Sequence, residues 1–268
     1  MTRLLSGVAL AAAAFALVWF LPSNGLLVVA LVVAGGAFLE YARLARAVDA
    51  PLPFVPALVS TLAACALVAW PLGEAPRAFV QLAPALFGVS LLAVAVSLMS
   101  SGLHGTPLVH GAAAGMLAPI YIGLPLGALV AIHQLAGREG VLALIATVAA
   151  SDSCQYYTGR LFGRRPLAPI ISPKKTIEGA IGGFVLAPLA LVAIAHWWLP
   201  ALHPAGVWAA GLGIVAAGIA GDLFKSTFKR AAGVKDSGTL IPGHGGVLDR
   251  IDALLFCAPL FYLLLMLA

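Results

Sequence analysis

The residues best suited to chemistry lie near the C-terminus, in the polar segment from Asp222 to Asp252. The apolar run before Asp222 holds no helix breaker, so we expect one helix to continue to about Ala232 and to end at Gly233. Four polar side chains at helical spacing would share one face of that helix: Asp222, Ser226, Lys229 and Arg230. A carboxylate, a hydroxyl and two cations in one stripe suit a metal-bound polyphosphate. Ordinary ion pairs at a solvated helix end would use the same residue types.

A second group of polar residues follows this helix. The run Gly243-His244-Gly245-Gly246 lacks side chains at three of its four positions, which lets backbone N–H groups approach an anion closely. His244 is either a catalytic residue or a hydrogen-bonded loop histidine. Asp249 and Asp252 are three residues apart, with Arg250 between them, and would share one helix face. Magnesium is the expected cation here, because it binds a few carboxylates together with phosphate oxygens and water.

The other polar segment, Ser151–Thr176, is basic. Asp152 lies near its start, and its cations form a patch made of Arg160, Arg164, Arg165, Lys174 and Lys175. A cytoplasmic retention signal would explain these charges by itself. The run from Ser172 to Thr176 is nevertheless more structured than such a signal requires. Thr176 is expected to cap the following helix, with the acidic Glu178 in its first turn.

The composition indicates that membrane helices position these residues. Of the 268 residues, 62% are hydrophobic and 9% are charged, and the mean hydropathy is +1.05. A soluble domain carries roughly 25% charged residues, so this chain cannot cover itself with a hydrated surface. We therefore expect an all-α, polytopic membrane protein and no binding of nucleic acid. The net charge of +5 favours contact with anionic lipid headgroups or with phosphate substrates. The three cysteines follow no metal or disulfide spacing and are expected to pack as small apolar residues.

Nine apolar segments are candidate spans, since a hydrocarbon core needs about 20 apolar residues per helix and sometimes as few as 17. Six are long: Leu4–Leu21, Phe54–Leu72, Ala78–Ser100, Val109–Ile132, Ile177–Leu199 and Ile251–Leu267. Three are shorter: Gly25–Leu39, Gly140–Ala150 and Val207–Gly221. A cleaved signal peptide is the alternative interpretation of the first segment.

The placement of Lys and Arg predicts the orientation. With the N-terminus inside, nine spans put 13 of the basic residues on the cytoplasmic side and leave only Arg77 and Arg138 outside. Both polar segments, 151–176 and 222–250, are then cytoplasmic and form the catalytic face, and the C-terminus is outside. We find no internal repeat, so residues 1–268 are predicted to form a single membrane-embedded domain.

From Ser226 to Asp252 the chain closely resembles the phosphatidate cytidylyltransferase (CDP-diacylglycerol synthase) family. The family pattern is Ser-x-apolar-Lys-Arg, four residues, Lys-Asp-x-small, then Pro-x-His-Gly-Gly-apolar-x-Asp-Arg-apolar-Asp. It is filled at the right spacing by Ser226, Phe228, Lys229, Arg230, Lys235, Asp236, Gly238, Pro242, His244, Gly245, Gly246, Val247, Asp249, Arg250, Ile251 and Asp252. The stretch from Asp152 to Gly179 is similar to the other cytoplasmic stretch of the family. Lys225 is a departure, because the family more often carries an acid at this position.

The resemblance implies transfer of CMP from CTP to phosphatidate by a dimeric membrane enzyme, with Mg²⁺ and with K⁺ as a candidate second ion. The catalytic residues would be Asp222, Lys229, Arg230, Lys235, Asp236, His244, Asp249 and Arg250. Substrate would be bound by Ser226, Gly245, Gly246, Asp152, Ser172, Lys174, Lys175 and Thr176. The metal would be held by Asp222, Asp249 and Asp252. The spacing of Gly179 and Gly183 would permit a close helix contact in a homodimer.

Two other classes of function remain as alternatives. A transporter is a rival because intramembrane charges often mark substrate paths, but here the charges gather at one face and no paired interrupted helices are evident. Another lipid-phosphate or lipid-alcohol transferase, such as a kinase or a CDP-alcohol phosphotransferase, is a closer rival. The Asp-Gly-x-x-Ala-Arg signature of the latter and P-loop spacing are both absent from the sequence.

Overall fold

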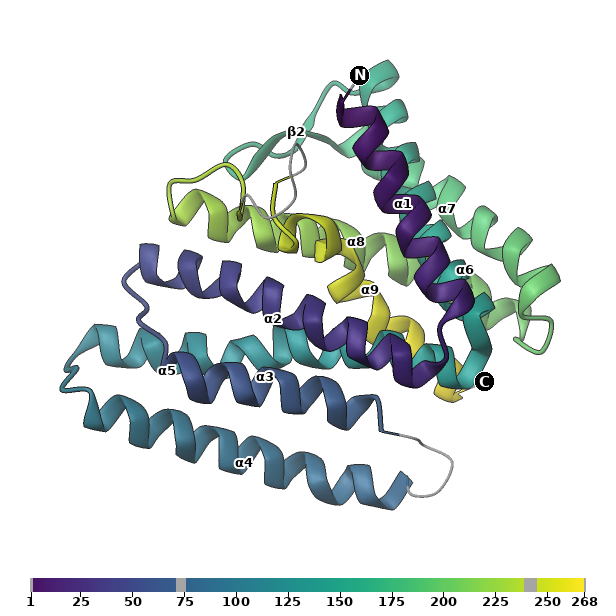
Figure 1. Ribbon diagram of the computed structural model, residues 1–268. Coiled ribbons are helices and arrows are strands. Elements are labelled where there is room, and N and C mark those ends of the chain that lie inside the picture. The colour runs from purple at the N-terminus through teal and green to yellow at the C-terminus, as the bar shows by residue number, and fades with distance from the viewer. Residues whose placement is uncertain (1, 71–75, 239–244, 268) are drawn as a thin grey trace. The chain divides into compact units, whose positions relative to one another are not determined.

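The computed structural model describes residues 2–70, 76–238 and 245–267, and helices dominate it. The long elements are α1 (Thr2–Phe20), α2 (Ser23–Ala47), α3 (Phe54–Val68), α4 (Pro76–Ser100), α5 (Thr106–Ala118), α6 (Leu124–Phe162), α7 (Ile177–Trp198), α8 (Pro204–Ala231) and α9 (Leu248–Leu267). A π-helical turn, η1 (Pro119–Gly123), joins α5 to α6. The expected all-α class is confirmed (Figure 1).

Six helices of the described chain are long and apolar enough to cross a membrane, which supports an integral membrane protein. Two shorter apolar helices cover Gly7–Phe20 and Phe54–Val68. The expected number of nine spans is not confirmed. One reason is that α5, η1 and α6 form a continuous helical run, Thr106–Phe162, which contains two of the predicted segments.

A break inside α6 still separates those two segments. Ala136 has φ −127° and ψ 15°, and Gly137 has φ 65°, so the backbone leaves the helical conformation between the expected spans Val109–Ile132 and Gly140–Ala150. Glycine adopts a positive φ without steric cost, whereas other residues do so rarely. The sequence therefore placed the interruption correctly.

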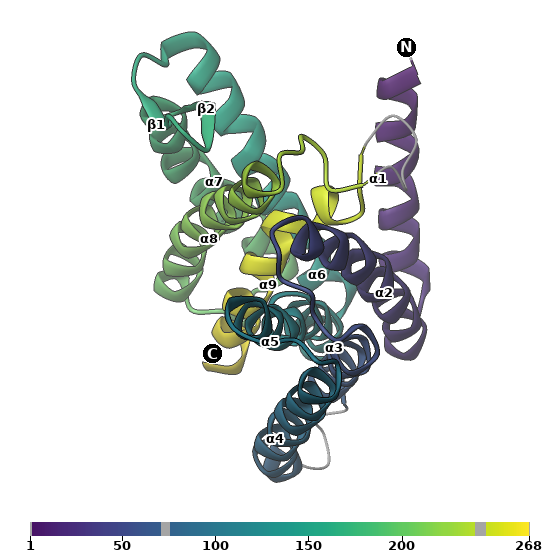
Figure 2. The ribbon, with the colours of Figure 1, turned by 90° about the vertical axis from the view of Figure 1, so that its left-hand side faces the viewer.

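The chain forms two compact units, and the first contains Met1–Ala131 and Ala231–Arg250. In this unit α2, α3 and α4 lie side by side (Figures 1 and 2). The Tyr41 hydroxyl of α2 donates to the carbonyl oxygen of Ala114 in α5 at 3.0 Å, in the buried interior. Gly123 of η1 packs directly on the backbone of Thr61 in α3, where a Cβ atom would overlap the carbonyl oxygen. Small residues thus let these helices approach closely.

The second unit contains Ile132–Arg230 and Ile251–Ala268. Glycines again mark its helix contacts: Gly183 of α7 packs on Gln155 of α6, and Gly221 of α8 packs on the first part of α9. The predicted dimer pair, Gly179 and Gly183, is buried and contacts α6 within the same chain. The glycine spacing is therefore explained by packing inside the unit, and the homodimer stays a prediction.

A small β-hairpin was not expected in the basic segment. Strands β1 (Pro166–Ala168) and β2 (Ser172–Thr176) pair antiparallel, and α6 continues as a helix to Phe162 (Figure 2). The polar connection is therefore shorter than the predicted range 151–176. The prediction for its end is confirmed, because the Thr176 hydroxyl caps α7 by accepting a hydrogen bond from the Gly179 N–H at 3.1 Å. Glu178 lies in the first turn of α7, as expected.

Candidate functional site

Helix α8 ends where the sequence predicted. Its last residue is Ala231, and Gly233 follows with φ 68°, a left-handed conformation that stops the helix. Asp222, Ser226, Lys229 and Arg230 all lie on α8 at the spacing of one face. The four side chains that were expected to share one helix face therefore do so on α8.

Two lysines and two aspartates form an ion-pair cluster inside the second unit. The Lys225 ammonium pairs with the Asp252 carboxylate and lies 3.4 Å from Oδ1 of Asp222. The Lys175 ammonium, at the end of β2, lies 2.7 Å from Oδ2 of Asp222. Lys225 is buried, with 7% of its side chain exposed, so its charge is stabilised by these carboxylates rather than by water. The ion pairs of this cluster connect β2, α8 and α9.

Asp152 of α6 adds a third carboxylate to this neighbourhood. It interacts electrostatically with Lys175, Lys225, Asp222 and Asp252. Sequence analysis had grouped Asp152 and Lys175 with the substrate-binding residues and Asp222 and Asp252 with the metal ligands. The fold brings all four near Lys225, the residue that departs from the family pattern.

The donor atoms of this cluster suit Mg²⁺ in type, since they are carboxylate oxygens. Within the described ranges, no group of three or more His, Cys, Asp and Glu side chains stands in an arrangement that could hold a metal ion. Mg²⁺ commonly takes one or two protein carboxylates and completes its shell with water and substrate phosphates. Asp222 is the more exposed of the two paired carboxylates, with 32% of its side chain exposed, while the Asp252 side chain is enclosed with Lys225; a metal-binding role for either stays a prediction.

Asp249 belongs to the first unit, and Ser237 and Gly246 hold its carboxylate in place. Its Oδ2 atom accepts hydrogen bonds from the backbone N–H of Ser237 at 2.9 Å and of Gly246 at 3.2 Å. The Ser237 hydroxyl lies 2.9 Å from the same oxygen. Gly245 has φ 79°, a conformation that favours glycine at this motif position. A shared metal between Asp222 and Asp249 stays a prediction.

Glu40 of α2 is a polar residue that sequence analysis missed. Its side chain is fully buried, and it accepts hydrogen bonds from Ser237, Val247 and Leu248 of the motif segment. One usable signal was present in the sequence, because Glu40 directly follows the apolar segment Gly25–Leu39, and an acid beside a membrane span often has a functional role. Its partners, however, lie about 200 residues further along the chain.

The remaining predicted site residues fall into four groups. Lys174, Arg230, Lys235, Asp236 and Arg250 are exposed, whereas Ser172, Ser226 and Lys229 are half-buried. Gly246 is buried against Glu40 and Ser237. His244, with Pro242 and Gly243, lies outside the described residues.

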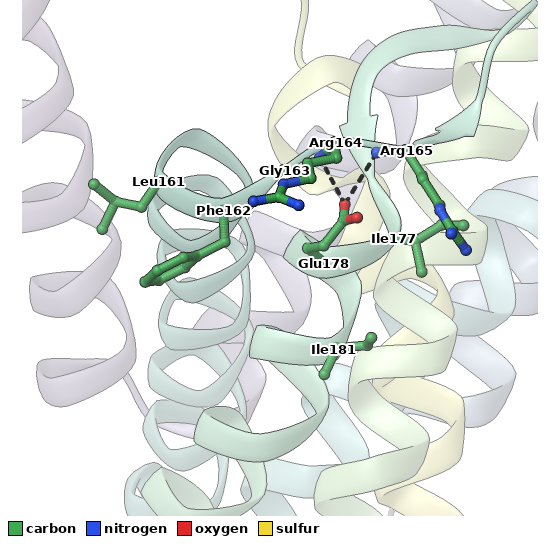
Figure 3. Close-up of a pocket in the computed structure, with 8 residues that line it drawn as sticks. All are labelled: Leu161, Phe162, Gly163, Arg164, Arg165, Ile177, Glu178 and Ile181. Atoms are coloured by element: carbon green, nitrogen blue, oxygen red, sulfur yellow. Dashed lines mark hydrogen bonds between the residues drawn. The ribbon is translucent and has the colours of Figure 1, made fainter.

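A cavity of about 570 Å³ lies at the junction of α6, the hairpin and α7 (Figure 3). Apolar side chains of Leu161, Phe162, Ile177 and Ile181 line it together with Arg164, Arg165, Gly163 and Glu178. The Glu178 carboxylate accepts hydrogen bonds from the backbone N–H groups of Arg164 and Arg165, at 3.0 and 3.3 Å. Figure 3 shows the guanidinium groups leaving this turn in different directions, that of Arg164 toward Phe162 and that of Arg165 beside Ile177. The cavity is thus amphipathic.

The apolar helices support an integral membrane protein, and the ion-paired cluster brings lysines and carboxylates together in its second unit. The chain belongs to the Cytidylyltransferase family, whose family model matches residues 1–268.

Several curated proteins are similar to the chain over part of its length. A phosphatidate cytidylyltransferase of Haemophilus influenzae is 47% identical over 118 residues, which cover 42% of this chain and 41% of the relative. That of Thermotoga maritima is 38% identical over 165 residues, covering 56% and 58%. The protein YnbB of Escherichia coli K12, named as uncharacterized, is 46% identical over 122 residues, covering 46% and 41%. The chain spans about half the length of the curated relatives that it matches.

Proposed function

We propose that the chain transfers CMP from CTP to phosphatidate, giving CDP-diacylglycerol and pyrophosphate. Family membership over the whole chain is the observation that carries this proposal. Relatives named phosphatidate cytidylyltransferase support the choice of substrates. The ion-paired cluster of the second unit supports chemistry on phosphates, because lysines and carboxylates are the groups that bind polyphosphates and their metal ions.

In the proposed reaction an oxygen of the phosphatidate phosphate attacks the α-phosphorus of CTP. A new P–O bond forms there, and the bond between the α-phosphorus and the bridging oxygen to the β-phosphate breaks, which releases pyrophosphate. The nucleophile is a phosphate monoester that is largely ionised at neutral pH, so no strong protein base is needed. Catalysis then depends on positioning and on neutralising negative charge.

The residues of the chain would divide this work. Lys229, Arg230, Lys235 and Arg250 are proposed to bind phosphate groups, and Gly245 to approach the triphosphate through its N–H group, since the Gly246 N–H already donates to Asp249. Lys175 and Lys225 hold the Asp222 carboxylate in place. Asp222 and Asp249 would bind Mg²⁺, with K⁺ as a candidate second ion, and Mg²⁺ would supply positive charge to the reacting phosphates. Asp252, already paired with Lys225, would contribute through that lysine.

The amphipathic cavity of Figure 3 suits the lipid substrate. It lies where α6 ends at Phe162 and α7 begins at Ile177, and with both helices spanning the membrane this would be the level of the headgroups. Arg164 and Arg165 would attract the lipid phosphate, and the exposed Phe162 and Ile181 side chains would contact the acyl chains. We propose this cavity as the entry site for phosphatidate.

The proposed setting is a bacterial inner membrane, with the active site on the cytoplasmic side and the enzyme a homodimer. Bacterial relatives and the distribution of basic residues support the setting. A different lipid-phosphate or lipid-alcohol transferase is the alternative function, and a transporter is a more distant one.

A direct assay tests the proposal. Purified protein in detergent with Mg²⁺ is incubated with CTP labelled in the α-phosphate, together with phosphatidate. We expect label in CDP-diacylglycerol and release of one pyrophosphate per product. Label in no lipid with any phosphatidate, or transfer from ATP but not from CTP, would reject a phosphatidate cytidylyltransferase.

A further inference from the structure

Glu40 is a carboxyl group buried inside the first unit. Its side chain is 0% exposed, although it lies on α2, an apolar helix that is long enough to span a membrane. Removing a carboxylate from water costs several kcal/mol unless hydrogen bonds or a charge stabilise it. A residue retained at such a cost needs strong partners.

The partners of Glu40 all lie after α8 in the chain, between Ser237 and Leu248. Oε1 accepts a hydrogen bond from the backbone N–H of Val247, and Oε2 accepts one from that of Leu248, both at 2.9 Å. The Ser237 hydroxyl also lies 2.9 Å from Oε2. Since α9 begins at Leu248, Glu40 satisfies N–H groups at the start of that helix, where a negative charge is favourable.

Two glycines of the motif let the backbone reach this carboxyl group. A Cβ atom added to Gly238 or Gly246 would overlap the oxygen atoms of Glu40. Small residues at these positions therefore have a structural reason, which is the close approach of the chain to Glu40.

Ser237 connects Glu40 to Asp249. Its hydroxyl lies 2.9 Å from Oε2 of Glu40 and 2.9 Å from Oδ2 of Asp249, and a hydroxyl has one proton to donate. The backbone N–H groups of Ser237 and Gly246 also donate to Asp249. One compact network thus holds two carboxyl groups and the backbone on both sides of the segment 239–244.

We propose that Glu40 is a positioning residue of the active site. It holds Ser237 in place before residues 239–244, and Val247 and Leu248 after them. Through Ser237 it also sets the orientation of the Asp249 carboxylate that would bind Mg²⁺. This inference rests on the proposed function for its kinetic consequences. The hydrogen bonds of Glu40 to Ser237, Val247 and Leu248, called the Glu40 clamp below, are a property of the first unit alone. Misplacing a catalytic group by about 1 Å can cost on the order of 100-fold in rate.

The experiment compares three variants of the full-length protein in detergent. Glu40→Gln keeps the shape of the side chain but replaces one acceptor with a donor, and Ser237→Ala removes the shared hydroxyl. Thr61→Val is the matched control: Thr61 is also fully buried in the first unit, and its hydroxyl donates only within its own helix, to Ala57. Each variant is measured for thermal unfolding, kcat, both KM values, the Mg²⁺ concentration at half-maximal rate, and hydrogen exchange at residues 245–248.

We expect Glu40→Gln to lower kcat about tenfold or more and to raise the Mg²⁺ requirement, with little change in KM for CTP. Ser237→Ala should do the same to a smaller extent, and the double variant should be less impaired than the product of the two losses. Amide exchange at Val247 and Leu248 should accelerate in Glu40→Gln. Thr61→Val should lower stability without changing kcat or the Mg²⁺ requirement.

The proposal is overturned if Glu40→Gln and Ser237→Ala retain normal kcat per folded molecule and a normal Mg²⁺ requirement. If Glu40→Gln does not fold, Ser237→Ala decides the kinetic question alone. If the wild-type protein does not act on CTP and phosphatidate, the proposed function fails. Hydrogen exchange then still tests whether Glu40 holds Val247 and Leu248 in place. Unchanged exchange at Val247 and Leu248 in Ser237→Ala and in folded Glu40→Gln would reject the Glu40 clamp.

Discussion

The ammonium group of Lys225 and the carboxylate of Asp252 form a buried ion pair, with 7% and 13% of the two side chains exposed. The pair joins α8 to the first turns of α9 within the second unit. Lys225 is also the position at which the chain departs from the family pattern. A cation here neutralises carboxylates that would otherwise repel one another, so the departure changes the charge at the centre of the cluster.

Removing Lys225 should destabilise the protein more than removing the whole pair. Lys225→Met leaves the buried Asp252 carboxylate uncompensated, and breaking such a pair costs about 3–5 kcal/mol. Lys225→Met with Asp252→Leu replaces both charges with apolar groups and should recover much of that loss. Chemical unfolding in detergent measures the difference. Equal losses in the single and double variants would show that the pair is not coupled.

Local features of the site were predictable because their causes are local. The end of α8 near Gly233 and the Thr176 cap of α7 both follow from residue types within a few positions. The stripe of polar residues on α8, from Asp222 to Arg230, follows from helical spacing alone. The family pattern added the identity of the chemistry, which spacing does not contain.

Long-range features were not predictable in the same way. Glu40 and Leu248 are separated by 208 positions, and no local pattern connects an acid in α2 with a backbone N–H of α9. The pairing of Asp252 with Lys225 was not expected, because it depends on how α8 packs on α9, and a metal-ligand role for Asp252 stays a prediction. The break inside α6 was predictable, in contrast, because it falls at Gly137, between two apolar segments of the sequence.

The glycine at position 179 should matter for folding rather than only for dimer formation. A Cβ atom there would lie 2.7 Å from the backbone oxygen of Gln155, which cannot easily move. Gly179→Ala should therefore destabilise the second unit by about 1–3 kcal/mol, as overpacking usually does. Gly88→Ala is the control, since nothing lies within 4 Å of its added Cβ atom. Thermal unfolding and mass in mild detergent separate a loss of stability from a loss of dimer.

The arginines of the amphipathic cavity should determine affinity for the lipid substrate. Replacing Arg164 and Arg165 with Ala removes two charged donors, and a charged hydrogen bond contributes about 1.5–3 kcal/mol. The KM for phosphatidate should rise about tenfold or more, while the KM for CTP stays close to normal. Arg138→Ala is the control, because Arg138 pairs with Glu139 away from the cavity lining. An unchanged KM for phosphatidate would remove the cavity from the substrate path.

The membrane orientation can be read by cysteine labelling. Ser237 would be a poor reporter because it is 5% exposed, whereas Val234 is 38% exposed and lies in the same segment. In a background without Cys65, Cys154 and Cys257, Val234→Cys should react only from the cytoplasmic side. Arg138→Cys should react only from outside, as the distribution of basic residues predicts. Labelling of position 234 from outside would reverse the predicted orientation.

Substitution of the two predicted metal ligands tests the mechanism most directly. Asp222 pairs with Lys175 and Lys225, and Asp249 is held by Ser237 and Gly246, so each carboxylate has a fixed position in its own unit. If both bind Mg²⁺, Asp222→Asn and Asp249→Asn should each lower kcat about 100-fold or more, which is typical of an electrostatic element in a transition state.

The double variant distinguishes shared from separate roles. Ligands of one metal act as a unit, so Asp222→Asn with Asp249→Asn should be little worse than either single variant. Lys235→Ala should behave differently, because an exposed cation that binds phosphate would weaken substrate binding without changing the Mg²⁺ dependence. Steady-state kinetics across a Mg²⁺ titration give all of these values. Near-normal turnover in both single variants, or losses that multiply in the double variant, would show that Asp222 and Asp249 do not share a metal ion.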